Sequence, residues 1–594
     1  MKQNLKQTAR ERFAAMTLFL LICLPFSLVQ AQTVKVNGRV TDDLNEPMIG
    51  VSIVEKGTAN GCITDIDGNY TLNVKQGATL VYSYIGYVAL ERKAVAGVMN
   101  IILKEDAQAL DEVVVVGYGV QKKSSVTGAI SQVKSEDIQN RSITRAEEAL
   151  QGKTAGVQLV STTSQPGSSP TIRIRGFSSN GTSDPLYVVD GLIVNDLSSI
   201  DPNNIKSMEV LKDAASAAIY GAQAGNGVVL ITTKSGSQGT SSISYDFQYS
   251  INSLARRPEL LNSQEYLTQM KEADPTFTDV NIRELISNGV WDGVSSTDWY
   301  DVAFNASPAS RHTVTFQGAN DKGSYFLSLN NLYDNGIIRE DRDTYKRLSV
   351  MLNADYKIKP WLKVGTTANY ANYTSKAISD GSGGTSYVSM IATVMTLAPY
   401  IADTYPADAL PTQMQAQIAN GFTLLQNANG DYYSCLGTME QVHPMVAIRM
   451  NDKKNTGNSL MGTLYANFTP IKDLVFTTRL GYRIATDNTY THNNLYYGSA
   501  SASNKDRNGV TRTSLSTTYY QWENFVNYNT TLLDTHNISA MLGMSYSQSD
   551  QIYVSAGVDK IAKDNLLYAD VDWPAGDAVK STGGHNYIYP QIRN

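Results

Sequence analysis

Cysteine, histidine and proline are scarce in this sequence of 594 residues. Three cysteines cannot build a disulfide framework, and Cys62 and Cys435 fall in different predicted domains. The five histidines are scattered, without the His-x-x-x-His spacing that puts two metal ligands on one helix face. A Gly-x-Ser-x-Gly nucleophile turn and a phosphate-binding loop are also missing. The sequence therefore predicts no enzyme, no cofactor and no metal site.

An excess of positive charge is also missing. There are 49 Lys and Arg against 55 Asp and Glu, a formal net charge of −6, and no basic run follows the extreme N-terminus. The sequence therefore gives no electrostatic reason to bind nucleic acid. Hydrophobic residues make up 42% of the chain, and its 35 tyrosines outnumber the other aromatics. This composition excludes a disordered protein, and the length indicates several domains or one very large sheet.

Residues 1–31 have the pattern of a signal peptide. A basic start is followed by an apolar core over residues 13–29, and Val29-Gln30-Ala31 offers a small-residue cleavage site before Gln32. Pro25 and this cleavage site disfavour the alternative, a membrane anchor. No later run reaches the roughly 20 apolar residues of a spanning helix. We therefore expect export, and residence in a membrane would require a β-barrel.

Residues 32–104 predict a small β-sandwich, because short alternating strands are separated by turn residues. The stretch around Asp65 and Asp67 resembles a calcium loop only in part. An EF-hand loop needs Gly at its sixth position and Glu at its twelfth, where this chain has Tyr70 and Gln76. We therefore expect a tight turn in which an Asp side chain bonds its own backbone.

Residues 105–120 form a linker of different character. Its four consecutive valines favour an extended backbone. The segment comprises Asp111, Glu112, Val113, Val114, Val115, Val116, Gly117, Tyr118 and Gly119. Two interpretations stay open on physical grounds. The segment is either an interior strand or an extended strip that pairs with the sheet edge of a partner.

Residues 121–236 predict a mixed α/β domain. Thr144 and Glu147 fit a capping box ahead of a helix. The stretch 171–176 alternates with Arg173 and Arg175 on one face, and further strands are expected at 186–191, 208–211 and 228–233. Asp213 is expected to cap an Ala-rich helix that runs to Tyr220 and ends at Gly221.

Residues 241–594 consist mostly of long alternating segments with aromatic residues at their ends. About nine are readable: 243–251, 312–318, 325–333, 348–356, 362–370, 460–468, 474–482, 517–528 and 538–546. A large soluble β-domain is the alternative. Together with export, this strand length and the tyrosine excess favour an antiparallel transmembrane barrel.

Five motifs together resemble SusC/RagA-type TonB-dependent outer-membrane transporters of the Bacteroidetes. They are DEVVVVGYG (111–119), TIRIRG (171–176), PLYVVDG (185–191), IKSMEVLKD (205–213) and AAIYGAQAGNGVVLITTK (217–234). The resemblance implies a mainly β chain: a carboxypeptidase-D-regulatory-like β-sandwich (32–104), a linker with a TonB-box-like segment (105–120), a plug domain (121–236) and the N-terminal part of a barrel (241–594). The plug motif residues that it implies are Arg173, Arg175, Gly176, Asp190, Gly191, Asp213, Tyr220, Gly221, Asn226 and Gly227.

The resemblance also implies partners and a function. These are import across the outer membrane, a TonB-ExbB-ExbD complex that pulls on residues 111–119, contact with outer-membrane lipids, and a SusD-like lipoprotein that delivers an oligosaccharide or a peptide. Such barrels have about 22 strands, so nine readable strands lead us to expect an N-terminal portion of a transporter. A non-transporting periplasmic binding or signalling module and a siderophore receptor are the alternatives. Trp291, Trp299, Tyr432 and Tyr433 either stack on sugar rings or pack the loops.

Overall fold

The structure is a computed structural model. It describes residues 33–593 except for 43–45, 59, 85–86, 88, 104–112, 117–118, 123–129, 140, 162, 164, 178–182, 214–216, 237–238, 379–389, 437–440, 533–535, 563–569, 573 and 576–578. The predicted signal peptide lies outside the described residues. The chain forms two compact units, one of residues 1–114 with 121–126 and one of residues 115–120 with 127–594.

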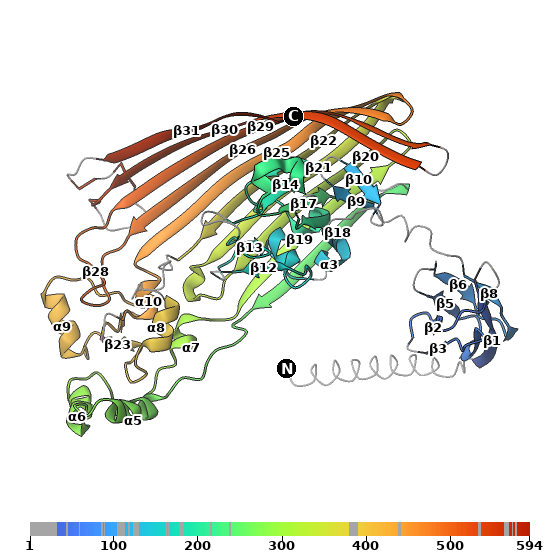
Figure 1. Ribbon diagram of the computed structural model, residues 1–594. Coiled ribbons are helices and arrows are strands. Elements are labelled where there is room, and N and C mark those ends of the chain that lie inside the picture. The colour runs from blue at the N-terminus through green and yellow to red at the C-terminus, as the bar shows by residue number, and fades with distance from the viewer. Residues whose placement is uncertain are drawn as a thin grey trace, which may run out of the picture. The chain divides into compact units, whose positions relative to one another are not determined.

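The first unit is a β-sandwich, as predicted. One sheet contains β1 (Thr33–Thr41), β4 (Asn69–Lys75), β7 (Gly97–Val98) and β8 (Ile101–Ile102), and the other contains β2 (Ser52–Glu55), β3 (Gly61–Ile63), β5 (Thr79–Ser83) and β6 (Leu90–Lys93) (Figure 1). Val36, Ile53 and Leu80 are buried between the sheets. The expected tight turn is present, because Asp65 Oδ1 accepts bonds from the backbone N–H groups of Asp67 and Asn69.

The valine segment is extended. Strands β9 (Val113–Val116) and β10 (Gly119–Lys122) form a two-stranded sheet. Asp111, Glu112, Gly117 and Tyr118 lie outside the described residues.

The second unit begins with an α/β domain, residues 130–234. Its five-stranded sheet has the order β11-β16-β17-β14-β15, in which only the β14–β17 pair is parallel among the described pairings. These strands are β11 (Ile130–Lys134), β14 (Leu186–Val189), β15 (Leu192–Val194), β16 (Ile205–Leu211) and β17 (Val228–Thr233). The other elements are the ribbon of β12 (Val157–Val160) and β13 (Thr171–Ile174), the helix α3 (Ser135–Gln139), and the 3-10 helices η3 (Ala146–Leu150), η4 (Pro202–Asn204) and η5 (Ala218–Ala224).

Of three local predictions in this domain, two were wrong. The expected capping box is absent, because η3 is capped at Arg145 without a side-chain bond and the Thr144 hydroxyl instead donates to Asp334. Arg175 does not share a strand face with Arg173, since β13 ends at Ile174 and Arg175 has a φ of 57°. The third prediction is confirmed. Gly221 interrupts the helix with a non-helical φ of 65°, and the chain kinks there between the two short helices that make up Ala218–Ala224.

The rest of the second unit is dominated by one antiparallel sheet, which we call the wall. Its ten described strands lie in the order β18-β19-β20-β21-β22-β25-β26-β29-β30-β31. They are β18 (Gly239–Asn252), β19 (Ser307–Ala319), β20 (Gly323–Asn335), β21 (Thr344–Lys359), β22 (Leu362–Lys376), β25 (Asn451–Ile471), β26 (Leu474–Asn493), β29 (Val510–Leu532), β30 (His536–Val558) and β31 (Lys580–Arg593). All nine predicted segments are strands. The tenth strand, β31, was not predicted.

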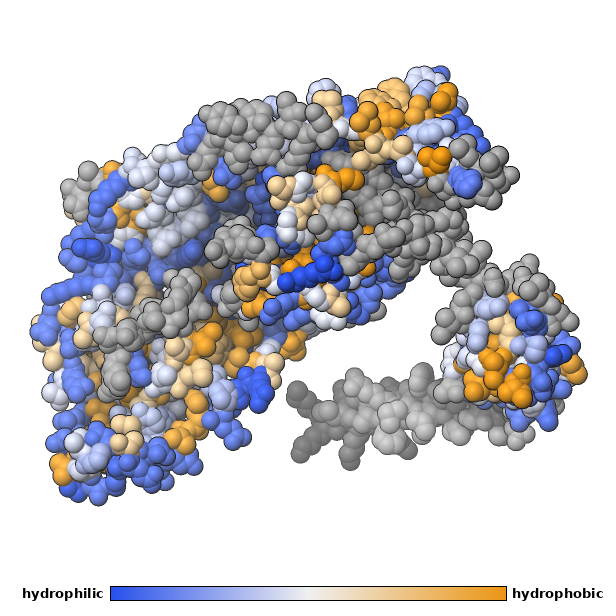
Figure 2. All heavy atoms as spheres, in the orientation of Figure 1, coloured by the Kyte–Doolittle hydropathy of each residue, from blue (hydrophilic) through white to orange (hydrophobic). Residues whose placement is uncertain are grey.

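Short turns join the strands at one end of the wall, and long connections join them at the other. The connections contain α5 (Ser263–Ala273), α6 (Asp279–Ser287), α7 (Trp299–Ala303), η6 (Arg339–Asp341), α8 (Met390–Thr396), α9 (Thr412–Ala419) and α10 (Pro444–Ala447). They also contain the short pairs β23 (Thr404–Tyr405) with β24 (Tyr432–Tyr433) and β27 (Tyr496–Tyr497) with β28 (Ser503–Asn504). On the side shown in Figure 2, hydrophilic side chains cover much of this end.

The two faces of the wall differ. On β21, Arg347, Ser349 and Met351 are buried, whereas Leu348 and Leu352, at the alternate positions, are exposed. The α/β domain lies against the inward face, the one with the buried positions, while the exposed face is rich in Leu, Ile, Tyr and Trp. Among the described helices, none has the length and apolar content to cross a bilayer.

Candidate functional site

Buried charged groups join the α/β domain to the wall. Arg347 Nη2 donates to Asp201 Oδ2 at 2.7 Å, and its Nη1 donates to the carbonyl oxygen of Ser198 at 2.9 Å. Arg311 on β19 lies 3.9 Å from the same carboxylate and donates to the carbonyl of Ile143. Arg347 and Asp201 are 1% and 0% exposed. Removing one partner of such a buried pair costs about 3–5 kcal/mol, because the other charge is left uncompensated.

A second contact holds the turn between β14 and β15. Arg479 Nη1 on β26 donates to the Asp190 carbonyl oxygen at 3.1 Å, and Gln521 Nε2 on β29 donates to the Gly191 carbonyl oxygen at 2.9 Å. The N–H of Ile193 donates back to Gln521 Oε1 at 3.2 Å. The wall therefore binds the backbone of this turn through both a cation and an amide.

Glu523 positions these two wall side chains. Its Oε2 lies 2.9 Å from Arg479 Nε, and its Oε1 accepts a bond from Gln521 Nε2 at 2.7 Å. Glu523 is 2% exposed, so the Arg479 charge balances a carboxylate that would otherwise be buried alone. Arg479, Gln521 and Glu523 form one group, which we call the wall clamp.

The turn that the wall clamp holds has an unusual backbone. Asp190 and Gly191 have φ values of 48° and 87°. A Cβ at position 191 would overlap the guanidinium of Arg479, so only glycine fits this close approach. The Asp190 carboxylate accepts bonds from the N–H and the hydroxyl of Thr233, at 3.0 and 2.6 Å. Burial raises the pKa of Asp190, while these two bonds act in the opposite direction.

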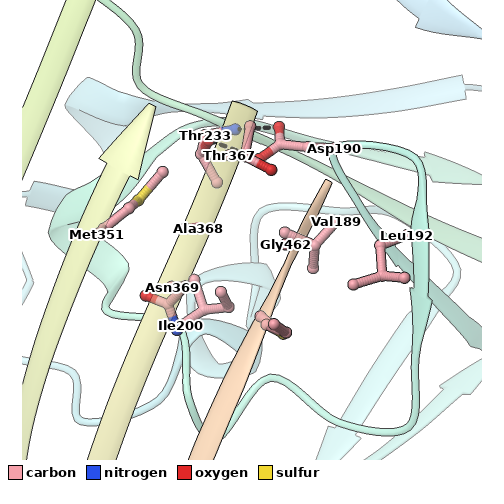
Figure 3. A pocket seen from close by; sticks show the side chains of 11 residues that line it. Val189, Asp190, Leu192, Ile200, Thr233, Met351, Thr367, Ala368, Asn369 and Gly462 are labelled. Carbon is pink, nitrogen blue, oxygen red and sulfur yellow. Dashed lines mark hydrogen bonds between the residues drawn. The ribbon is translucent and has the colours of Figure 1, made fainter. Parts of the chain in front are cut away.

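Further polar bonds continue along the wall. Asn369 Nδ2 donates to the carbonyl oxygen of Ser199 at 2.9 Å, and the Thr144 hydroxyl donates to Asp334 Oδ2 at 2.8 Å. Figure 3 shows a small cavity that Asn369 helps to line, where Asp190 with its bond to Thr233 faces the β22 side chains.

Apolar contacts accompany these polar bonds. In the described residues, the main buried apolar cluster of the α/β domain includes two wall side chains, Met461 and Tyr519, and Met351 lies across a small cavity from Ile200. Charges and backbone carbonyls provide the directional contacts at this interface.

The predicted plug residues have varied roles. Asp190 and Gly191 meet the wall clamp, whereas Arg173 stays within the domain, where its Nη1 donates to Asp184 at 2.5 Å. The Asn226 side chain bonds the carbonyl oxygen of Asp184. A Cβ at Gly227 would lie 2.8 Å from Ile174 Cδ1, so that glycine permits close packing of η5 on β13.

Three further residues of the plug motifs were predicted. Tyr220 is buried, and burial raises its pKa. Gly176 has a φ of 92° with open space around it. The carbonyl of Asp213 accepts a bond from the N–H of Ala217, but residues 214–216 lie outside the described residues, so the expected cap is not tested.

Sequence analysis missed the residues that hold the domain. Arg311, Arg347, Arg479, Gln521 and Glu523 were not singled out. A signal did exist, because each is a long polar side chain at an inward position of an alternating strand. Such a position in a strand that faces lipid on its other side needs a partner inside.

The aromatic loop residues pack the connections. Trp299 is 1% exposed, donates from Nε1 to the carbonyl of Ala398 at 3.2 Å, and meets the ring of His443 edge-on at 5.1 Å. Trp291 and Tyr433 are also buried. These rings belong to, or lie beside, a large apolar cluster formed by the connections. Of the two interpretations, loop packing therefore describes them.

No group of His, Cys, Asp and Glu among the described residues has the geometry to hold a metal. The candidate functional site is the set of polar contacts that attaches the α/β domain to the wall.

Comparison with known proteins identifies two domains of the chain. The TonB-dependent Receptor Plug Domain matches residues 122–228, and the CarboxypepD_reg-like domain matches residues 36–115. The TonB-dependent receptor SusC of Bacteroides thetaiotaomicron is 34% identical over 488 residues, which are 79% of this chain and 47% of SusC.

The chain belongs to the SusC-type TonB-dependent receptors.

Other similar proteins support the same family assignment. The TonB-dependent receptor P3 of Formosa agariphila is 30% identical over 568 residues, 93% of this chain and 52% of P3. The structure of the RagAB peptide transporter matches with a TM-score of 0.64 and 23% identity, over 78% of this chain and 52% of that chain, and supports the fold. The SusC-type chain spans about half the length of the curated relatives it matches.

Proposed function

We propose that this chain serves TonB-dependent import of a nutrient across the outer membrane. The α/β domain acts as the plug of the pathway, and the wall is part of the barrel around it. An oligosaccharide or a peptide is the substrate class, and a SusD-like lipoprotein delivers it. The export signal and the apolar outward face of the wall support this location.

The observation that carries the proposal is the polar attachment of the α/β domain to the inward face. A domain fixed by apolar burial would expose that surface to water on release, at about 25 cal/mol per Å². A domain fixed by charges and amides exchanges its bonds for bonds to water, so each contact contributes only about 0.5–1.5 kcal/mol net, and more where charge is involved. Such an attachment is stable at rest and yields to a pull.

The pull acts through residues 111–119. An extended strip pairs with a sheet edge of TonB by main-chain hydrogen bonds, and the ExbB-ExbD complex supplies the force. Tension on this strip reaches the α/β domain through β10 and the following residues. The contacts at Asp201 and at the wall clamp then break, and a path opens along the inward face.

The alternative that best competes is a periplasmic binding or signalling module without transport. A proline variant of the strip separates the two. Val114→Pro/Val115→Pro removes two backbone donors and blocks strand pairing. We expect uptake of the nutrient to fall to the level of a deletion strain, while the amount of protein in the outer membrane stays normal. The variant is made in the native host at the chromosomal locus.

A matched control is Val95→Pro, at an exposed residue outside the strands of the first unit. This control should transport normally. Growth of wild-type and deletion strains on single oligosaccharides and peptides first identifies the nutrient. Normal uptake by Val114→Pro/Val115→Pro would show that TonB does not use this strip. Equal growth of wild-type and deletion strains on every nutrient would favour the non-transporting module.

A further inference from the structure

The outward face of the wall has a shallow apolar groove across four neighbouring strands, β21, β22, β25 and β26. Paired outward side chains form it in two rows. One row contains Ala354, Thr366, Leu464 and Leu480, and the other contains Tyr356, Val364, Ala466 and Thr478. Short side chains make the floor, while Tyr356, Leu464 and Leu480, which are 42–51% exposed, stand beside it.

An aromatic row lies next to the groove, on the side of the short turns. Trp361 stacks on Phe468 with ring centroids 6.2 Å apart, and Phe468 lies 6.1 Å from Phe476. Phe468 and Phe476 are direct register partners. Aromatic rings of this kind mark the boundary between hydrocarbon and headgroups. The groove therefore begins on the hydrocarbon side of that boundary.

Exposed lysines surround the short turns beyond the aromatic row. They are Lys322, Lys357, Lys359 and Lys472. Among the described residues, no hydrogen bond or ion pair engages their ammonium groups, whereas Lys363 pairs with Asp355 at 3.0 Å. The turns adjoin each other, because the N–H of Lys357 donates to the carbonyl of Lys322 and that of Thr469 donates to the carbonyl of Trp361.

The charge balance of this rim is positive. Lys322, Lys359 and Lys472 share it with Asp321 and Asp473. Asp355, Lys357 and Lys363 are not counted, because they alternate with the outward Tyr356 and Val364 and so lie on the inward face. The whole chain, in contrast, has a net charge of −6. Local positive charge on a negative protein favours an anionic partner at this rim.

We propose that the groove and the basic rim together bind one phospholipid with an anionic headgroup. The phosphate lies among the rim lysines, and an acyl chain lies in the groove between Tyr356 and Leu464. This inference rests on the outer-membrane location in the proposed function. In that orientation the short turns face the periplasm, so the lipid comes from the inner leaflet.

The dimensions agree with this occupant. Outward rows are two residues apart, or about 7 Å along a strand. The two groove rows therefore lie about 7 and 14 Å from the row of Phe468. One leaflet of a hydrocarbon core of about 30 Å is about 15 Å deep. The groove thus ends near the depth that a single acyl chain reaches.

Native mass spectrometry on the protein purified from the outer membrane of its host tests the proposal. The detergent-solubilised protein is titrated with phosphatidylglycerol and, separately, with phosphatidylethanolamine. We expect one phosphatidylglycerol per chain, bound at least tenfold more tightly than phosphatidylethanolamine. Ala466→Leu fills the groove and should weaken binding of phosphatidylglycerol at least tenfold. Ala540→Leu, at an exposed alanine on β30, should leave it unchanged.

A second pair of variants tests the headgroup. Lys359→Gln/Lys472→Gln should abolish the preference for phosphatidylglycerol, while Lys453→Gln/Lys454→Gln, at the far end of β25, should keep it. Absence of a bound phospholipid, equal affinity for both lipids, or unchanged binding by Ala466→Leu would each overturn the proposal. Retention of lipopolysaccharide in place of phospholipid would also overturn it. Import by the same variants is measured separately, so a failure of this inference leaves the proposed function standing.

Discussion

The interface between the α/β domain and the wall differs in kind from the core of the long connections. The first is held by Arg347 with Asp201 and by the wall clamp on a backbone turn. The second buries Trp299, Met414 and Val442 in a cluster contributed by several connections. In the proposed function, the first region separates during import and the second stays together. Polar bonds exchange with water at little net cost, whereas buried apolar area does not.

Among the variants that test this comparison, Trp299→Ala is expected to have the largest effect. Loss of a fully buried tryptophan leaves a cavity and costs about 3–5 kcal/mol. We expect the largest fall in the melting temperature of the purified protein, together with a lower amount at the cell surface. Ile391→Ala, at a 52% exposed residue of α8 outside this cluster, is the control and should change the melting temperature little. Equal effects of the two variants would show that the cluster is not a core.

Arg347→Ala is expected to have the next largest effect. It leaves the Asp201 carboxylate buried without its main partner, at a cost of up to about 3–5 kcal/mol. The α/β domain should loosen, and cells should become sensitive to antibiotics too large for ordinary pores.

The triple variant Arg311→Met/Arg347→Met/Asp201→Asn removes the charges of the pair and of Arg311, which would otherwise stay buried without a carboxylate. Replacement of buried paired charges by groups without charge is often neutral. This triple variant should restore antibiotic resistance. Persistent sensitivity would show that the ion pair itself, and not the avoidance of a lone charge, holds the domain.

Gly191→Ala tests the contact between the turn and the wall clamp by adding a single methyl group. The alanine must keep the positive φ of this position, which costs about 1 kcal/mol or more. Its Cβ also displaces Arg479 of the wall clamp. Gly152→Ala has the same backbone strain, with a φ of 72° and open space around the new Cβ. We expect antibiotic leakage with Gly191→Ala and none with Gly152→Ala. Leakage from both would assign the effect to backbone strain.

The smallest effect concerns pH in the connections. Asp343 precedes β21, and burial raises its pKa to about 7, with Asp334 and Asp341 adding to the rise. The unfolded value is about 3.9. Because the folded state binds the proton more tightly, the stability contributed by this group is complete below about pH 4 and is lost as the pH rises through about 7.

The melting temperature should therefore fall between pH 5 and pH 8, and Asp343→Asn should make that decline shallower. Thermal unfolding at a series of pH values measures it. An identical slope in the variant would show that Asp343 does not titrate in this range.

The strands were readable from the sequence because each wall strand has one polar and one apolar face. The alternation of Ile243, Tyr245 and Phe247 is an example. β31 lacked this pattern, since Gly583, Gly584 and Pro590 interrupt it and its pairing with β30 determines its conformation. Here the neighbouring strand, and not local propensity, sets the structure.

The site was readable only in part. Motif resemblance led to Asp190 and Gly191 but gave no partner for them. The partners Arg479, Gln521 and Glu523 come from strands about 290–330 residues away, a distance that no local pattern spans. The same holds for Thr144, whose hydroxyl bonds Asp334 on the wall instead of capping its own helix. Long-range polar contacts compete with local capping, and the sequence does not record which one prevails.

One measurement tests the central claim, that the α/β domain separates from the wall during import. Ser142 Oγ in the domain lies 3.3 Å from Ser250 Oγ on β18, so Ser142→Cys/Ser250→Cys can form a disulfide between the two. The matched control is Thr513→Cys/Ser555→Cys, whose hydroxyl oxygens lie 2.9 Å apart within the wall, on β29 and β30. Both are made with Cys62 and Cys435 changed to Ser.

Nutrient uptake is measured in the native host before and after a reductant. We predict that the oxidised domain-to-wall pair blocks uptake and that reduction restores it, while the control pair transports in both states. Normal uptake with the domain-to-wall disulfide fully formed would contradict the account.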